Sequence, residues 1–131
     1  MKSAEIQTAV YQRLASLAPL QAIVGARVYD DVLQPTQFPY VVIGDDTSIS
    51  WDDDVNNGAE STLTIHAWSR YYGRIEAKRI LQAIYDGMHN YRLPITGAYT
   101  VLCQAEYQET FLDPDGITRH GVIRFRLITT H

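Results

Sequence analysis

The stretch that decides the fold is residues 99–130, YTVLCQAEYQETFLDPDGITRHGVIRFRLITT, in which two alternating runs flank a turn. Successive side chains of a strand point to opposite faces of a sheet, so residues two apart share a face. In the second run, Ile123, Phe125 and Leu127 share one face, while Arg124 and Arg126 share the other. The first run alternates in the same way, with Val101, Cys103, Ala105 and Tyr107 set against Leu102, Gln104, Glu106 and Gln108.

The turn between these runs is Asp113-Pro114-Asp115-Gly116. Proline presets φ, the aspartates bond to their own backbone, and glycine accepts a positive φ. We therefore predict a long β-hairpin with strands over residues 99–112 and 122–129.

A second hairpin is predicted upstream of this one. Residues 40–44 form a strand that Pro39 opens, since a proline lacks the N–H that an inner strand needs. Residues 62–67 alternate again, with Leu63, Ile65 and Ala67 on one face. The polar segment 52–58 joins the two strands and ends in Asn-Gly, a strong hairpin signal.

Two amphipathic helices complete the pattern. Apolar residues recur at helical spacing over residues 6–17 and again over 75–88, where Ile75, Ile80, Leu81, Ile84 and Met88 form a stripe. Ala18-Pro19 ends the first helix or starts a short turn. With a short extended piece at 28–29, the order is helix, strand, hairpin, helix, hairpin. This order predicts an α+β fold: an antiparallel sheet built from two hairpins, with two amphipathic helices packed on one face.

Length and composition narrow the class of protein. The chain has 131 residues, which fits one domain over 1–131, and a formal charge of −4, which disfavours wrapping around nucleic acid. Cys103 is the only cysteine, so no intramolecular disulfide forms. No run approaches the about 20 apolar residues of a membrane span, and we expect no membrane contact. The nine tyrosines and two tryptophans suit protein interfaces, or else they cover the core and the sheet.

No catalytic or metal-binding motif emerges from the sequence. The four histidines lack metal-ligand spacing, and no nucleophile motif or glycine-rich phosphate loop is present. Asp52, Asp53 and Asp54 fit a solvated loop tip better than a weak cation site, because the spacing of a calcium loop is missing. We therefore predict a protein that is not an enzyme and that has no cofactor and no metal.

One basic group remains, made of Arg119, His120, Arg124 and Arg126. It fits an acidic surface on a neighbouring subunit, transient contact with DNA phosphates, or a solvated outer face of the sheet. Exposed ion pairs contribute little to stability, so a solvated outer face of the sheet is weighed equally with an acidic surface on a neighbouring subunit.

Four segments together resemble a known family. They are residues 38–44 (FPYVVIG), 63–70 (LTIHAWSR), 73–78 (GRIEAK) and 112–126 (LDPDGITRHGVIRFR). In this order they resemble a widespread family of short phage and prophage proteins, long catalogued as a domain of unknown function. Its members are associated with tail completion, as tail terminators in the neck of long-tailed phages and gene transfer agents. The resemblance covers nearly the whole chain, and the loop at 52–57 is its variable part.

The resemblance implies a structural virion protein of the tail and neck, assembled in the host cytoplasm. Such a protein forms a ring, expected to be a hexamer, that caps the tail tube, ends tail growth and provides the surface for head–tail joining. The implied partners are further copies of the chain, the major tail tube protein and the head-closure or connector protein. DNA passes through the ring without specific binding, and an acidic chain fits that passage.

The family has no catalytic residues, so the site candidates are contact residues. Trp51, with the loop of Asp52, Asp53 and Asp54, tops the first hairpin and faces the tail tube or a neighbour. Trp68, Tyr71 and Tyr72 lie where a strand meets a helix and anchor an interface. Arg124 and Arg126 pair with an adjacent subunit. Two alternatives remain: another neck component, such as a head-closure or minor tail protein, and a small ligand-binding domain.

Overall fold

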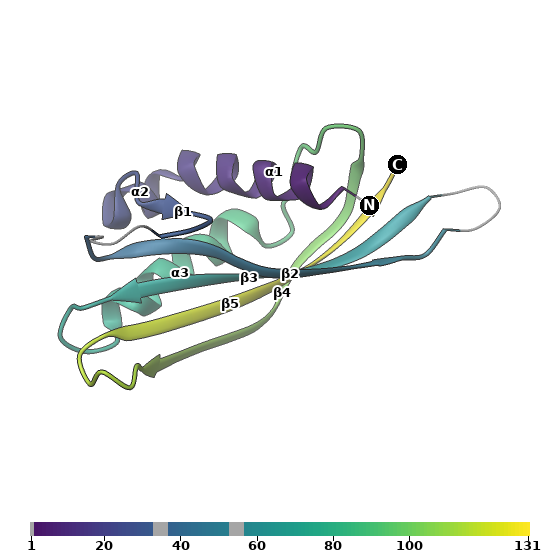
Figure 1. Ribbon diagram of the computed structural model, residues 1–131. Coiled ribbons are helices and arrows are strands. Elements are labelled where there is room, and N and C mark those ends of the chain that lie inside the picture. The colour runs from purple at the N-terminus through teal and green to yellow at the C-terminus, as the bar shows by residue number, and fades with distance from the viewer. Residues whose placement is uncertain (1, 33–36, 53–56) are drawn as a thin grey trace.

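The computed structural model describes residues 2–32, 37–52 and 57–131. These residues form three helices on one face of a five-stranded sheet (Figure 1). The helices are α1 (Ser3–Ser16), α2 (Ala18–Val24) and α3 (Ile75–Met88). The strands are β1 (Val28–Tyr29), β2 (Tyr40–Ser50), β3 (Gly58–Ser69), β4 (Tyr99–Leu112) and β5 (Arg119–Thr130), in the sheet order β1-β2-β3-β5-β4. The fold is α+β, as predicted.

The sheet is mixed, so the prediction of an antiparallel sheet made from two hairpins was incomplete. β1 pairs with β2 in parallel, with Val28 opposite Val41, while the other neighbouring strands pair antiparallel. The N–H of Val41 donates to the carbonyl of Arg27 at 3.0 Å, and Arg27 Nε donates to the carbonyl of Pro39 at 2.7 Å. A strand of two residues shows no alternation of apolar and polar residues, so the sequence could not predict that β1 pairs with β2 in parallel.

The helix count was also wrong, because a third helix, α2, follows α1 after the extended Leu17. Pro19 is the second residue of α2. The first N–H groups of a helix have no intrahelical acceptor, so a proline in the first turn breaks no hydrogen bond. α1 packs on β1 and β2, whereas α3 packs on β3, β4 and β5.

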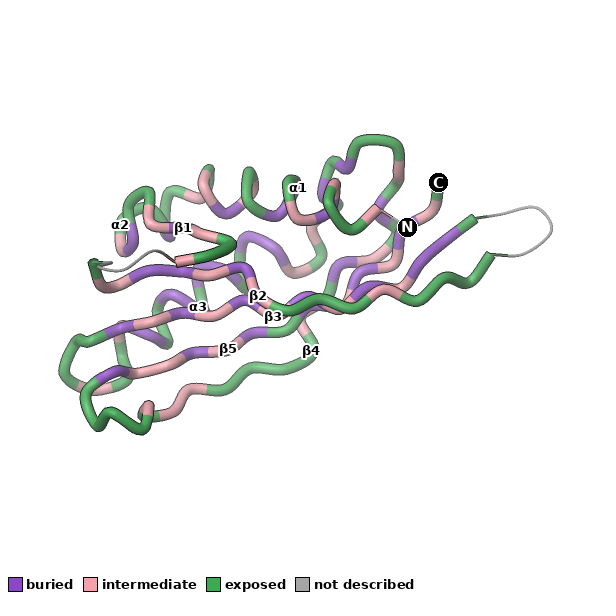
Figure 2. The backbone as a smooth tube through the Cα atoms, viewed as in Figure 1, coloured by how far each residue is buried: buried purple, intermediate pink, exposed green. Residues whose placement is uncertain are grey.

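The core lies between the helices and the inner face of the sheet. Figure 2 shows buried positions alternating along β3 and β5, as the period of two predicts. The largest fully buried side chains include Phe125, Ile123 and Leu127 of β5, Ile65 of β3, Leu14 of α1, and Ile80, Leu81 and Ile84 of α3. Ile75 departs from the predicted stripe: it is 50% exposed, at the start of α3 beside Ile23 of α2.

Bulges break the predicted alternation of β4. Its register against β5 shifts between Thr100 and Leu102 and again between Ala105 and Tyr107. Each bulge adds one residue to a strand and reverses the face of the residues that follow. Cys103 is therefore buried as expected, whereas Val101 and Tyr107 are 55% and 44% exposed.

The two hairpin connections differ in how far the sequence predicted them. The turn at 113–116 forms as expected, with Gly116 at φ +77° and Asp115 Oδ1 accepting from the N–H groups of Ile117 and Thr118. The Asn-Gly pair is not the turn of the first hairpin, because Gly58 is already the first residue of β3. β2 runs on past the predicted end at residue 44, through a register shift between Ile43 and Asp46.

The position of Phe125 at the centre of the core leads to a stability prediction. Phe125→Ala should lower the free energy of unfolding by about 3–5 kcal/mol, because it removes buried contacts and leaves a cavity. Tyr99→Ala, at a side chain that is 78% exposed, should change it by less than about 0.5 kcal/mol. Urea denaturation of both variants measures the difference, and equal losses would contradict this assignment of the core.

Candidate interaction surface

The face of the sheet that points away from the helices carries a row of rings, which we call the aromatic row. It consists of Tyr40 on β2, Trp68 on β3, His120 on β5 and Phe111 on β4, each directly opposite the next. Trp68 and His120 stack with ring centroids 3.8 Å apart, and Phe111 lies 4.7 Å from His120. Phe38 extends the row, 5.0 Å from Tyr40. Directly opposed aromatic side chains stabilise neighbouring strands, so this row ties four strands together.

A histidine pair adjoins the aromatic row. His66 Nδ1 and His120 Nε2 lie 2.7 Å apart, within hydrogen-bond distance. Burial lowers the pKa of both rings below the ordinary 6.5, and burial together with the neighbouring His66 brings the pKa of His120 to about 4. Two neutral rings share one proton between them at pH 7, one donating and the other accepting. The sequence placed His120 only in the basic group and did not pair it with His66, because their contact depends on the pairing of β3 with β5.

The centre of the same face is charged, and its arginines already have partners. Arg124 Nε donates to Glu106 Oε1 at 2.8 Å, and Arg126 Nε donates to Glu60 Oε1 at 2.5 Å. These side chains are 46% and 38% exposed, so the pairs add little stability. The two predicted arginines thus lie together, within a mixed rather than purely basic surface.

The end of the first hairpin exposes apolar side chains. Trp51 is 42% exposed, and its ring covers Gly58 so closely that a Cβ there would lie 2.8 Å from it. Asp52 Oδ1 accepts from the N–H of Gly58 at 3.1 Å. Asp53 and Asp54 lie outside the described residues. Trp51 and Asp52 therefore form the described part of this predicted contact group.

The corner between β3 and α3 separates the three aromatic residues that the sequence grouped together. Trp68 lies in the aromatic row, whereas Tyr71 and Tyr72 are 58% and 91% exposed at the corner. Ser69 Oγ accepts from the N–H of Tyr71 at 3.1 Å and donates to Glu76 Oε1 at 2.8 Å. These bonds hold the corner and leave both tyrosine rings facing solvent.

Nothing in the described part of the chain assembles a metal centre or a reactive thiol. No three His, Cys, Asp or Glu side chains come together there in a way that would hold an ion. Burial raises the pKa of the Cys103 thiol to about 12, so it stays protonated and unreactive at pH 7. None of the helices formed by these residues has the length and apolar character that a bilayer crossing requires.

The histidine pair makes the stability of the fold depend on pH. A lowered pKa in the folded state means that the unfolded chain takes up the proton first, so stability falls as pH drops from about 6.5 to about 4. His120→Phe should reduce this loss, whereas His131→Gln, at the exposed terminus, should leave it unchanged. Urea midpoints at pH 7 and pH 4.5 measure this loss of stability in each variant. An unchanged pH dependence in His120→Phe would refute its assignment to the histidine pair.

Comparison with known proteins places the chain in a family. The family model described as tail completion protein gp17 matches residues 8–130. Tail completion protein gp17 of Bacillus phage SPP1 is 29% identical over 126 residues, which cover 96% of this chain and 92% of that protein. The solved structure of SPP1 gp17 superposes with a TM-score of 0.65 at 28% identity, over 95% of this chain and 88% of the other.

The fold recurs in a chain from the virion of a native gene transfer agent particle. That chain has a TM-score of 0.90 at 24% identity, over 99% of this chain and 98% of its own length. The superposition on this chain confirms the fold. The family model confirms the resemblance to the tail-completion family that the sequence analysis described. Because the family model matches nearly every residue, from 8 to 130, the chain belongs to the tail completion protein gp17 family.

Proposed function

We propose that this protein completes a phage-type tail by forming a ring on the end of the tail tube. The observation that carries the proposal is the match of residues 8–130 to the tail completion family. The fold shared with a chain of a gene transfer agent virion supports a place in the particle. The ring ends tube growth and presents a surface for joining to the head.

The remaining features of the role follow from this proposal. Residues 1–131 act as one tail-terminator-like domain, and six copies close the ring. The neighbours are the major tail tube protein and the head-closure or connector protein, and DNA passes through the centre without specific binding. An excess of acidic residues, with a formal charge of −4, keeps DNA from adhering to the ring. The protein carries out no catalytic step, and copies that fold in the host cytoplasm join the tail.

The contact residues are assigned from their exposure. The exposed Trp51, with the loop of Asp52, Asp53 and Asp54, reaches the tube. An exposed apolar ring flanked by charge is typical of interface anchors. Arg124 and Arg126, whose side chains remain partly exposed, bind carboxylates of an adjacent copy, and Trp68 supports that surface from the aromatic row.

Capping of tail tubes tests the proposed function. Purified protein added to assembling tail tubes should give tubes with a ring-shaped density on one end, and it should stop their elongation. Negative-stain imaging and light scattering measure both effects. A protein that stays monomeric with tubes present, and never caps them, would refute the proposal.

The two arginines offer a more specific test. Arg124→Glu combined with Arg126→Glu should weaken capping and leave the folded state intact, because the ion pairs that it removes are partly exposed to solvent and such pairs contribute little to stability. The matched control, Arg92→Glu, changes another exposed arginine away from the sheet face and should cap normally. Circular dichroism monitors folding. Loss of folded protein in the double variant would show that the pair is structural instead.

A further inference from the structure

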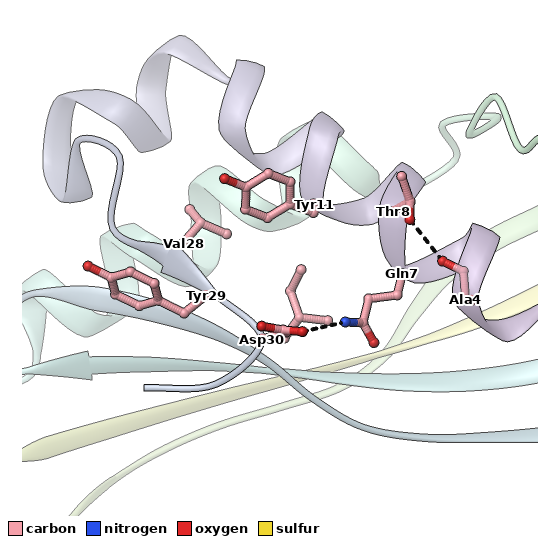
Figure 3. A pocket seen from close by; sticks show the side chains of 8 residues that line it. Ala4, Gln7, Thr8, Tyr11, Val28, Tyr29 and Asp30 are labelled. Atoms are coloured by element: carbon pink, nitrogen blue, oxygen red, sulfur yellow. Dashed lines mark hydrogen bonds between the residues drawn. The ribbon is translucent and has the colours of Figure 1, made fainter. Parts of the chain in front are cut away.

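A groove of about 600 Å³ lies at the edge of the sheet, between α1 and β1, and Ile43 of β2 also lines it. Figure 3 shows Tyr11 coming from α1 and Tyr29 from β1, on opposite sides of the opening. Gln7 Nε2 donates to Asp30 Oδ2 at 3.0 Å and holds the end of β1 against the helix. The walls are thus two aromatic rings and a fixed carboxylate.

One acidic side chain, Asp30, lines this groove, and further aspartates follow nearby in the chain. Asp30 lines it, Asp31 follows, and Asp45 and Asp46 come shortly after Ile43, another lining residue. All four aspartates are exposed, and the ion pairs among the described residues include none of them. A groove lined by two tyrosines and by the carboxylate of Asp30 fits an occupant that presents an aromatic ring together with positive charge.

One segment of the chain combines aromatic rings with positive charge. It consists of residues 70–74, Arg-Tyr-Tyr-Gly-Arg, and we call it the basic loop. Tyr72 is 91% exposed, and Arg74 is exposed too and takes part in none of the ion pairs of the described residues. Gly73, at φ +98°, turns the chain from Tyr72 into α3. The guanidinium of Arg119 lies 5.9 Å from the centroid of the Tyr72 ring. Leaving so large a ring in water forgoes its burial energy, and an exposed ring is a ready anchor for an interface.

We propose that the basic loop of one copy docks into the groove of the next copy. Tyr72 enters between Tyr11 and Tyr29, and Arg74 binds the carboxylate of Asp30. The elements that line the groove, α1, β1 and β2, lie at a different place on the molecule from the basic loop between β3 and α3 (Figure 1), so the contact is head-to-tail, the kind that a closed ring requires. This inference rests on the proposed ring and names the contact that holds it together.

Cysteine cross-linking of capped tubes tests the contact. The variant Thr8→Cys with Tyr71→Cys places thiols in the groove and in the basic loop, while the buried Cys103 stays unreactive. A short bismaleimide should link successive copies into a ladder that ends at the ring. Each single variant should give no ladder, because neither position meets itself across a head-to-tail contact.

The matched control is Thr8→Cys with Tyr99→Cys, whose second thiol lies at an exposed position far along the chain from the basic loop. It should give no ladder. Rings visible on tubes without a ladder in the Thr8 and Tyr71 variant, or an equal ladder in the control, would overturn the docking proposal while the ring itself stands. Absence of rings in the unchanged protein would instead refute the proposed function.

A charge exchange gives an independent measurement. Arg74→Asp should weaken capping about tenfold, the size of one lost interfacial ion pair, and adding Asp30→Arg should restore most of it. Arg92→Asp, an exposed arginine outside the basic loop, should cap normally. If Arg74→Asp caps as well as Arg92→Asp does, or if the exchange restores nothing, the proposed pairing is wrong.

Discussion

β5 hydrogen-bonds to β3 along one side and to β4 along the other, and it supplies the most deeply buried ring of the core. Its inner face carries the buried Phe125 and packs against α3 together with β3 and β4, while α1 packs on β1 and β2. Its outer face carries His120, Arg124 and Arg126. The packing that stabilises the fold therefore also sets the spacing of the rings and charges on the open face.

Strong local periodicity made the central strands and the two longer helices predictable from the sequence. Leu63, Ile65 and Phe125 are buried where the alternation put them. The parallel pairing of β1 was not predictable, since two residues carry no periodic signal. The bulges of β4 also escaped the pattern, because an extra residue such as Glu106 looks locally like any other strand residue.

The candidate surface was predictable only in part, for a related reason. Exposed aromatic rings such as those of Tyr72 and Trp51 could be found from residue type and their place beside a turn. The contact between His66 and His120, and the pairing of Arg126 with Glu60, join residues far apart in the sequence. No single-sequence pattern reports which of them meet. The groove between α1 and β1 leaves no motif either, because its walls come from elements that are unremarkable on their own.

The outer edges of the sheet bear on how assembly is controlled. β1 covers only Val41 and Val42 of β2, which leaves the acidic segment with Asp45 and Asp46 at a bulged edge. The opposite edge, β4, is bulged twice and carries Glu106 and Glu109. Strand edges of like charge and irregular register resist joining to one another. Free copies are thereby protected from joining edge to edge into open-ended fibres.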